Sequence, residues 1–186
     1  MGLPSTIDPS EVARITRWQY DAMVASGALE EAKVELLEGV IVDMSPQGAE
    51  HAGAIEVLAG QLREALGERV RVREEKPFAA SDDAEPEPDI AVVPPGDPFA
   101  GHPARAFLVV EVADSSLKKD RGVKTAIYAR ASVPEYWVVN LQDRVVEVHL
   151  HPQGGRYART SIARRGESIT LAHFPDVRVE LDRFLR

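Results

Sequence analysis

Two carboxylates, Asp89 and Glu111, interrupt short apolar runs that are typical of buried strands, residues 90–93 and 108–112. Burying a carboxylate is costly unless it is paired or coordinates a metal ion. If the two strands are neighbours, one divalent cation between the side chains would satisfy both. Magnesium is commonly held by one or two carboxylates, with waters and substrate phosphate completing its shell. The pair therefore predicts a Mg²⁺ or Mn²⁺ site that hydrolyses a phosphodiester.

Such a site works better with a cation that orients the attacking water, and Lys124 is the candidate. It lies one turn into a helix predicted after the Glu111 strand, so it can point back over the strand end. Side chains alternate along a strand, which places Ala113 on the same face as Glu111. Lys124 also follows Asp120 by four residues, so an exposed ion pair between them is the alternative. Helix spacing alone favours that alternative.

The elements that would position these residues follow from apolar periodicity and from turn residues. Helices are predicted over 9–26, with Asp8 as the N-cap, over 47–66 and over 119–131. Strands are predicted over 34–37, 40–42, 69–75, 77–80, 89–93, 106–112, 135–140, 145–150 and 157–162. This order predicts an α/β fold with a mixed sheet flanked by helices and an N-terminal helix and hairpin extension.

We expect a single domain over residues 1–186, because no repeat or linker divides the chain. Within it we distinguish the helix and hairpin extension at 1–46, a core at 47–150, and C-terminal strands and a tail at 151–186. Hydrophobic residues make up 44% and charged residues 28% of the chain, as in globular proteins. Cysteine is absent. Without a long apolar run or a signal peptide, we expect a cytoplasmic protein without membrane contact.

The net charge of −8 opposes the obvious use of a phosphodiesterase site, because proteins that grip DNA usually present a basic face. One basic feature is the alternation of Arg69, Arg71 and Arg73 along a predicted strand. These side chains either line a local groove or form a solvated strand face, and the solvated face is the more common case.

Several motifs in this order closely resemble the Uma family of endonucleases, which belongs to the PD-(D/E)XK, or restriction-endonuclease-like, superfamily. The similarity runs from about residue 10 to the C-terminus. It rests on Pro88-Asp89-Ile90, Leu108 to Ser116, Asp120 to Tyr128, Val133 to Val139, Val34 to Ile41, Met44-Ser45-Pro46 and His51. The resemblance implies a restriction-endonuclease-like mixed sheet.

The resemblance also implies that Asp89 and Glu111 hold the metal and that Lys124 replaces the superfamily's lysine. In the superfamily pattern that lysine lies two residues after the acid, where this chain has Ala113. The vacated position on the Glu111 face leaves room for a lysine that arrives from the following helix.

Further candidates come from the same motifs, each with a structural alternative. Glu35 is a third acidic candidate, or a surface carboxylate on a hairpin. His51 could contact a scissile phosphate or carry a proton, but packing against the helix start is the favoured alternative. Ser115 and Ser116, with Asp120, could bind substrate, although N-capping of the following helix explains one of the serines.

The leading interpretation is a metal-dependent endonuclease that hydrolyses DNA with a water nucleophile. The alternatives are a nuclease-fold binding or assembly module without turnover, favoured by the acidic charge and by Ala113, and the same chemistry on RNA or branched DNA. Because cutting both strands of a duplex generally requires two active sites, we expect a homodimer.

Overall fold

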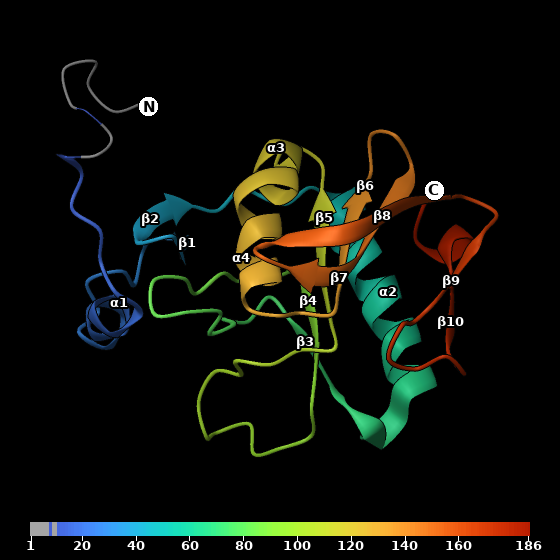
Figure 1. Cartoon of the computed structure of the whole chain (residues 1–186), viewed down its shortest axis with the longest axis horizontal. Coiled ribbons are helices and arrows are strands. Elements are labelled where there is room, and N and C mark those ends of the chain that lie inside the picture. Colours follow the sequence, from blue (N-terminus) through green and yellow to red (C-terminus); the bar gives the residue numbers. More distant parts are fainter. Residues whose placement is uncertain (1–7, 9–10) are drawn as a thin grey trace.

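The computed structural model describes Asp8 and residues 11–186, and its centre is a six-stranded mixed sheet (Figure 1). The strand order is β3-β4-β5-β6-β7-β8. The bounds are Arg71–Glu74, Ile90–Val93, Leu108–Ala113, Glu135–Asn140, Val145–Gln153 and Arg156–Arg164. All neighbouring pairs are antiparallel except β5 and β6, which are parallel. A parallel pair needs a crossover, and helices between residues 117 and 130 provide it.

Helices cover both faces of the sheet, and Figure 1 shows α2 and α4 on opposite sides. On one face α2, Ala49–Leu66, packs against alternate strand residues such as Ile90 and Val110. On the other, Tyr128 of α4, Thr125–Arg130, packs among Val109 and Ala113. Because side chains alternate along β5, Glu111 points to the α4 face. The strand therefore directs one carboxylate into an otherwise apolar layer.

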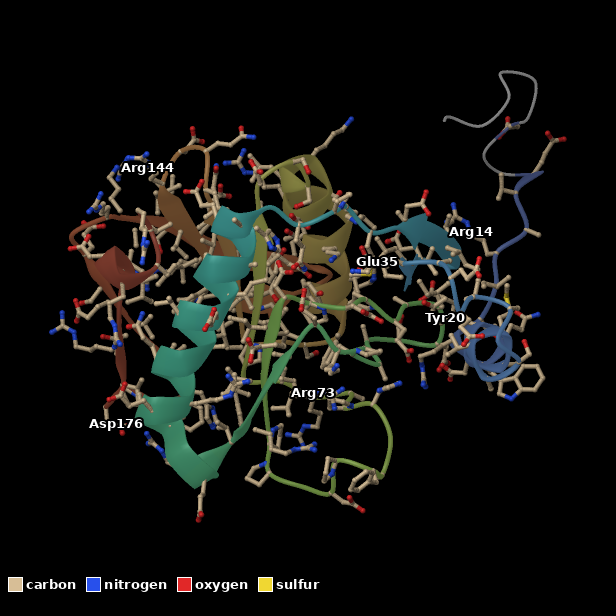
Figure 2. The ribbon with its side chains drawn as sticks, turned by 180° about the vertical axis from the view of Figure 1, so that it is seen from behind. Arg14, Tyr20, Glu35, Arg73, Arg144 and Asp176 are labelled. Atoms are coloured by element: carbon tan, nitrogen blue, oxygen red, sulfur yellow. The ribbon has the colours of Figure 1, made fainter. Side chains whose placement is uncertain are left out.

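The N-terminal extension is a helix and a hairpin beside the central sheet. Helix α1, Arg17–Ala25, starts with a capping box between Thr16 and Gln19. The hairpin consists of β1, Val34–Leu37, and β2, Val40–Asp43, joined by the predicted two-residue turn at Glu38 and Gly39. Both turn residues have positive φ, as tight hairpins require. The Tyr20 hydroxyl donates to the Val34 carbonyl at 2.9 Å, which joins the helix to the hairpin (Figure 2).

The C-terminal segment closes the α2 side of the core. Strands β9, Ser168–Thr170, and β10, Arg178–Glu180, pair with each other and are followed by the short helix η4, Leu181–Arg183. The Gln61 side chain of α2 donates to the Glu180 carbonyl and accepts from the Glu180 N–H, both at 3.2 Å. Ile169 of β9 and Val179 of β10 belong to the same buried cluster as the apolar residues of α2, so both strands are part of the main core.

The α/β class, the mixed sheet and the extension are as predicted, but several boundaries differ. The first helix begins at Arg17 instead of after Asp8, and the predicted position Pro9 lies outside the described residues. Segment 77–80 is not a strand, because its backbone bonds go to the irregular segments around 84–86 and 103. The division at residue 150 falls inside β7, and β8 continues the central sheet into the segment assigned to the C-terminal part.

The predicted helix 119–131 begins earlier and is not uniform. It consists of α3, Leu117–Lys119, a π-helical turn η3, Asp120–Lys124, and α4. A 3-10 turn, η2 at Gly67–Arg69, follows α2, so β3 starts at Arg71 instead of Arg69. In the described part of the chain no helix is both long and apolar enough to cross a bilayer.

Candidate active site

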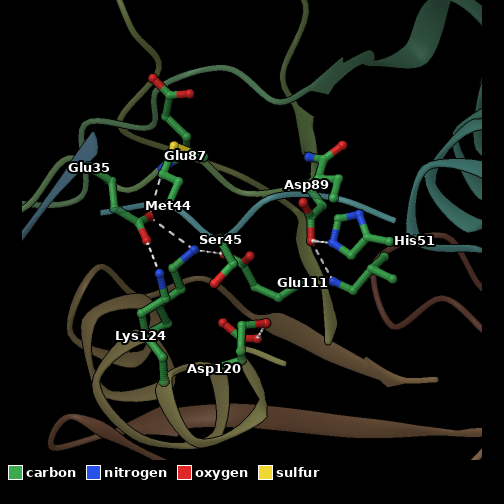
Figure 3. A pocket seen from close by; sticks show the side chains of 13 residues that line it. Glu35, Met44, Ser45, His51, Glu87, Asp89, Glu111, Asp120 and Lys124 are labelled. Carbon is green, nitrogen blue, oxygen red and sulfur yellow. Dashed lines mark hydrogen bonds and ion pairs between the residues drawn. The ribbon is translucent and has the colours of Figure 1, made fainter. Parts of the chain in front are cut away.

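Asp89 and Glu111 line one small pocket of about 50 Å³ at the edge of the α4 face (Figure 3). Asp89 immediately precedes β4, and Glu111 lies in β5, the neighbouring strand. The exposed fractions are 8% for Asp89 and 3% for Glu111. The predicted neighbouring arrangement is therefore present, and both carboxylates sit where a buried charge needs partners.

Asp89 occupies a gap in the hydrogen bonding between β4 and β5. The pairing of these strands ends at Ile90 and Val110, so the Val112 N–H has no β4 residue opposite it. The Asp89 Oδ2 atom accepts from that N–H at 2.6 Å. His51, in the first turn of α2, places its Nε2 atom 3.5 Å from the same oxygen. Burial lowers the pKa of His51, but the hydrogen bond and charge of Asp89 outweigh it and raise the pKa overall.

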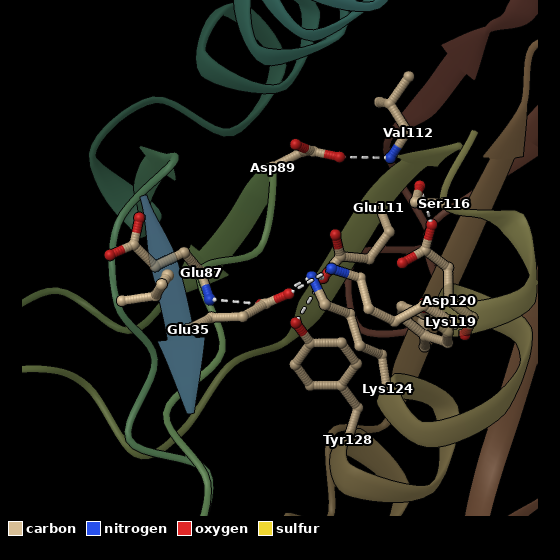
Figure 4. A network of polar contacts seen from close by, with 12 residues as sticks. Glu35, Glu87, Asp89, Glu111, Val112, Ser116, Lys119, Asp120, Lys124 and Tyr128 are labelled. Carbon is tan, nitrogen blue, oxygen red and sulfur yellow. Dashed lines mark hydrogen bonds and ion pairs between the residues drawn. The ribbon is translucent and has the colours of Figure 1, made fainter. Parts of the chain in front are cut away.

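Glu111 receives two donors on one oxygen. Its Oε1 atom lies 3.0 Å from Lys124 Nζ and accepts from the Tyr128 hydroxyl at 2.6 Å (Figure 4). Burial raises the pKa of Glu111 well above its usual range, and the Lys124 charge offsets this only in part. The second oxygen, Oε2, is not used by these two donors.

Glu35 joins two lysines from the crossover helices to the hairpin extension. Its carboxylate is fully buried and lies 2.8 Å from Lys119 Nζ and 3.0 Å from Lys124 Nζ. Burial raises the pKa of Glu35, but the two ammonium groups outweigh it and lower the pKa overall. Burial likewise lowers the pKa of Lys124, whereas Glu111 and Glu35 raise it above its usual value. The pKa values of the two carboxyls that contact Lys124 thus shift in opposite directions, down for Glu35 and up for Glu111.

Asp120 enters the pocket from the π-helical turn. Ser116 donates to its Oδ2 atom, while Oδ1 is buried without a hydrogen-bond partner in the described structure. Burial raises the pKa of Asp120. The Asp120 carbonyl accepts from the hydroxyls of Thr125 at 2.7 Å and Tyr136 at 3.0 Å, which fixes the turn against the sheet. π-helical turns inserted between α-helices frequently occur at functional sites.

The structure brings most of the predicted candidates together. Pocket-lining residues among them are Glu35, His51, Asp89, Glu111, Ser116, Asp120 and Lys124. Ser115 is exposed and does not line the pocket. Ser116 occupies the N-cap position of α3, but its hydroxyl bonds the Asp120 carboxylate instead of a backbone N–H.

Two of the structural alternatives are wrong. Glu35 is fully buried, so it is not a surface carboxylate. Lys124 is 3% exposed and pairs with Glu35 and Glu111, so it does not form an exposed ion pair with Asp120.

Sequence reasoning missed two members of this network, Lys119 and Tyr128. Lys119 adjoins Asp120 in the chain, but its partner Glu35 is 84 positions away, and no local pattern relates them. Tyr128 follows Lys124 by four residues, so the spacing places both on one helix face, but the spacing alone assigns Tyr128 no role in the site.

The oxygen donors in the pocket suit a divalent cation. Within the described ranges, no group of three or more His, Cys, Asp and Glu side chains is arranged to hold a metal ion. Magnesium does not need such a group, since waters and substrate phosphate complete its shell. Asp89, Glu111 and Asp120 offer carboxylate oxygens to the pocket, and Asp120 Oδ1 is buried without a partner in the described structure, a hard-donor chemistry that fits Mg²⁺ or Mn²⁺.

The comparisons with known proteins agree with this fold. The mixed sheet flanked by helices is that of a nuclease-like α/β protein. It superposes with a TM-score of 0.66 on the crystal structure of a "putative nuclease belonging to DUF820" from Anabaena variabilis ATCC 29413, at 15% identity, covering 83% of this chain and 90% of that one. The chain belongs to the Uma2 family, described as "Putative restriction endonuclease", whose model matches residues 19–182. No curated protein matches it.

Proposed function

We propose that this protein is a metal-dependent endonuclease that hydrolyses DNA phosphodiester bonds with a water nucleophile, within one restriction-endonuclease-like domain. The observation that carries the proposal is one pocket in which Asp89 and Glu111 lie beside a buried lysine held by Glu35. Membership of the Uma2 family supports a nuclease activity. The chemistry of the pocket supports the metal dependence and the DNA substrate, because carboxylates suit a hard cation and an ammonium group suits a phosphodiester.

Asp89 and Glu111 would hold the divalent cation through oxygens that the protein's own donors leave free. When bound, the cation would lower the pKa of a coordinated water and offset the negative charge that develops on the phosphate. The Val112 N–H and His51 fix the Asp89 carboxylate, and Tyr128 and Lys124 fix that of Glu111. Such fixed orientation lowers the reorganisation needed in the transition state.

Lys124 contributes a positive charge at the pocket. Two carboxylates flank its ammonium group at 3.0 Å, which keeps it protonated and oriented. An ammonium in this position donates hydrogen bonds to the attacking water or to a phosphate oxygen. We therefore assign Lys124 to positioning water and stabilising the transition state. Asp120 and Ser116 line the same wall, where they can contact the substrate or its waters.

The direct test incubates the purified protein with supercoiled plasmid and either Mg²⁺ or Mn²⁺. We expect nicked or linear DNA, no cleavage in EDTA, and at least about a hundred-fold loss of rate in Asp89→Asn, since the ligand carboxylate is removed. Asp97→Asn, in an exposed loop, is the matched control. Absence of cleavage of every DNA form, or full activity in Asp89→Asn, would refute the proposal. A parallel reaction with RNA and with a branched DNA junction identifies the preferred substrate.

We further propose that a homodimer is the form that cuts both strands, because each chain contributes one such pocket. A dimer predicts linear plasmid as an early product, whereas a monomer predicts accumulation of the nicked circle. Light scattering after size-exclusion chromatography measures the oligomeric state independently.

A further inference from the structure

Strand β3 is one edge of the central sheet, and two arginines on it share a face with the pocket carboxylates. Among the described strands β3 pairs only with β4, with Arg73 opposite Ala91 and Arg71 opposite Val93. Asp89, Ala91 and Val93 alternate to one side of the sheet, so both arginines lie on that side. At about 3.4 Å per residue, Arg73 is about 7 Å and Arg71 about 14 Å along the sheet from Asp89.

The same edge is hollowed and basic. An open cavity of about 640 Å³ is lined by Arg63, Arg71, Arg73, Lys76, Glu74, Val72 and Pro98. Four of these side chains are cations and one is an anion, and the single carboxylate, Glu74, pairs with Arg63. The chain as a whole carries a net charge of −8. A local cluster of positive charge on an acidic protein therefore suggests a binding surface for an anion.

Arg71 and Arg73 have no carboxylate partner in the described structure. The Arg71 Nε atom donates to the Pro94 carbonyl at 3.4 Å, and an Arg73 terminal nitrogen donates to the Pro77 carbonyl at 3.3 Å. Arg73 Nε is buried without a partner among the described residues. Burial lowers the pKa of Arg73, and the charge of Arg71 lowers this pKa further. Figure 2 shows Arg73 beside the loop that follows β4.

Arg69, which the sequence grouped with these two residues, is different. It lies in η2 and forms an ion pair with Asp176 at 2.8 Å. Along this part of the described chain, the cations without a carboxylate ion-pair partner are therefore Arg71, Arg73 and Lys76, the ones nearest the pocket.

We propose that this basic edge, Arg71, Arg73 and Lys76, binds the phosphodiester backbone of the nucleic-acid strand whose scissile bond enters the active-site pocket. The inference rests on the proposed function for its substrate. A row of cations that leads away from a catalytic pocket complements a linear polyanion, whereas a single small anion would need only one cluster. The Glu75 N–H donates to the Asp89 carbonyl at 3.2 Å, so the end of the basic strand adjoins the metal-binding carboxylate directly.

The test measures the salt dependence of binding, because each neutralised phosphate contributes about one unit to the slope of log K against log salt. A fluorescein-labelled DNA duplex and the corresponding single strand are titrated by anisotropy in the Asp89→Asn background with Mg²⁺, which separates binding from turnover. We expect Arg71→Gln and Arg73→Gln each to lower the slope by about one unit. Arg73→Lys keeps the charge and is expected to keep the slope.

Arg159→Gln is the matched control, because Arg159 is an exposed arginine on β8, the opposite edge strand. It is expected to leave the slope unchanged. Thermal melting of each variant checks folding, and Arg71→Gln is the safer variant because its side chain is not deeply packed. Slopes that stay unchanged in the β3 variants, equal losses in Arg159→Gln, or absence of binding would overturn the inference.

These outcomes are separable from those of the proposed function. If the wild-type protein cuts DNA while the β3 variants keep the full salt slope, the basic edge is not the binding surface and the nuclease proposal stands. If the slopes fall as expected but Mg²⁺ and Mn²⁺ give no cleavage, the surface is correct and the nuclease proposal fails.

Discussion

Lys124 is a buried cation whose charge the fold must compensate. Its ammonium group is almost completely removed from water, and it gains two carboxylates in return. Removing one partner of a buried ion pair is far more destabilising than replacing the whole pair, because the remaining charge is left uncompensated. Lys124 therefore stabilises the fold as well as serving the proposed chemistry.

We predict that Lys124→Met lowers the free energy of unfolding by about 3–5 kcal/mol, because Glu35 and Glu111 remain buried without that countercharge. Urea denaturation measures the change. Lys118→Met is the control, since Lys118 is exposed on the neighbouring helical turn. A loss below about 1 kcal/mol, or an equal loss in the control, would contradict this account.

Individual residues were predictable where they violate a local pattern. Asp89 and Glu111 stand out because each places a charge in an apolar run. The pairing of Glu35 with Lys119 was not predictable, because it depends on the hairpin packing against a helix 84 positions later. The burial of Lys124 was hidden for the same reason. Its nearest charged neighbour in helical spacing is Asp120, whereas its partners lie on two strands.

The burial of Glu85, a residue that does not line the active-site pocket, predicts that stability depends on pH. Glu85 is 3% exposed, its Oε2 atom has no hydrogen bond among the described residues, and Arg17 lies 3.8 Å away. Burial, together with the charge of Asp21, raises the pKa of Glu85 to about 7. The folded state therefore retains this proton at a higher pH than the unfolded state does. The contribution to stability is present below the unfolded pKa and is lost as the pH rises through about 7.

We predict that Glu85→Gln stabilises the protein above about pH 8 by up to about 3 kcal/mol and has little effect below about pH 4.5. Urea denaturation of wild type and variant across this pH range gives the difference between their free energies of unfolding. Groups that titrate alike in both proteins do not contribute to this difference. Glu68→Gln, at an exposed position, should show no such pH-dependent difference. A difference that stays constant with pH would exclude Glu85 as the titrating group.

Among the elements, the hairpin of β1 and β2 depends most on a single residue. Gly39 has φ of +76°, and an added Cβ would lie 2.8 Å from the Cβ of Arg14 and 3.1 Å from the Ile15 carbonyl oxygen. The Gly39 carbonyl accepts a hydrogen bond from the Ile15 N–H at 3.0 Å, and the Gly39 N–H donates to the Asp83 carbonyl at 2.6 Å. The hairpin in turn presents Glu35 to the lysines.

We predict that Gly39→Ala destabilises the protein by about 1–3 kcal/mol more than Gly154→Ala does, as measured by urea denaturation. Gly154 also has positive φ, at +57°, but an added Cβ there meets nothing within 4 Å. The pair therefore separates backbone strain, common to both and worth about 1 kcal/mol, from the clash at Gly39. Equal losses would show that the contact with Arg14 relaxes freely.

Elements with strong local signals were predicted well, and those set by tertiary contacts were not. The hairpin turn at Glu38-Gly39 and the long α2 helix ending at Gly67 follow from residue preferences. The π-helical turn at 120–124 has no such signal, since its carbonyl partners Thr125 and Tyr136 come from two different elements. Strands β9 and β10 have three residues each, too few to show a period.

At the scale of the whole molecule, the C-terminal residues predicted to form a tail complete the main core. Leu181, Phe184 and Leu185 are buried and belong to the same cluster as Leu58 and Leu62 of α2. Burying each such side chain contributes about 1.5–3 kcal/mol. Together these three contributions equal a large part of the free energy of unfolding of an ordinary domain.

We predict that deleting residues 181–186 abolishes cooperative thermal unfolding, as followed by circular dichroism and calorimetry. Deletion of Arg186 alone is the control, because that residue is exposed and should cost little. A sharp transition close to that of the full chain would show that α2 keeps its packing without this segment.

The N-terminal extension is attached through far fewer buried apolar residues than the sheet and α2 share with each other. The sheet and α2 share a cluster of 24 buried residues, whereas the hairpin meets α4 through a cluster of three, Leu37, Ala84 and Ile127. Regions with few buried contacts open by local fluctuations well below the global unfolding free energy. The extension is therefore the expected first unit to detach, and Glu35 would leave with it.

Partial opening of this kind would switch the protein off while most of it stays native. In a urea titration, catalytic activity should disappear at a lower concentration than the circular dichroism of the sheet and α2. Hydrogen exchange should show the amides of 34–43 losing protection before those of 108–112. Coincident transitions would mean that the extension and the sheet unfold as one. The small apolar cluster between the extension and α4 would thus set the conditions under which the protein stays active.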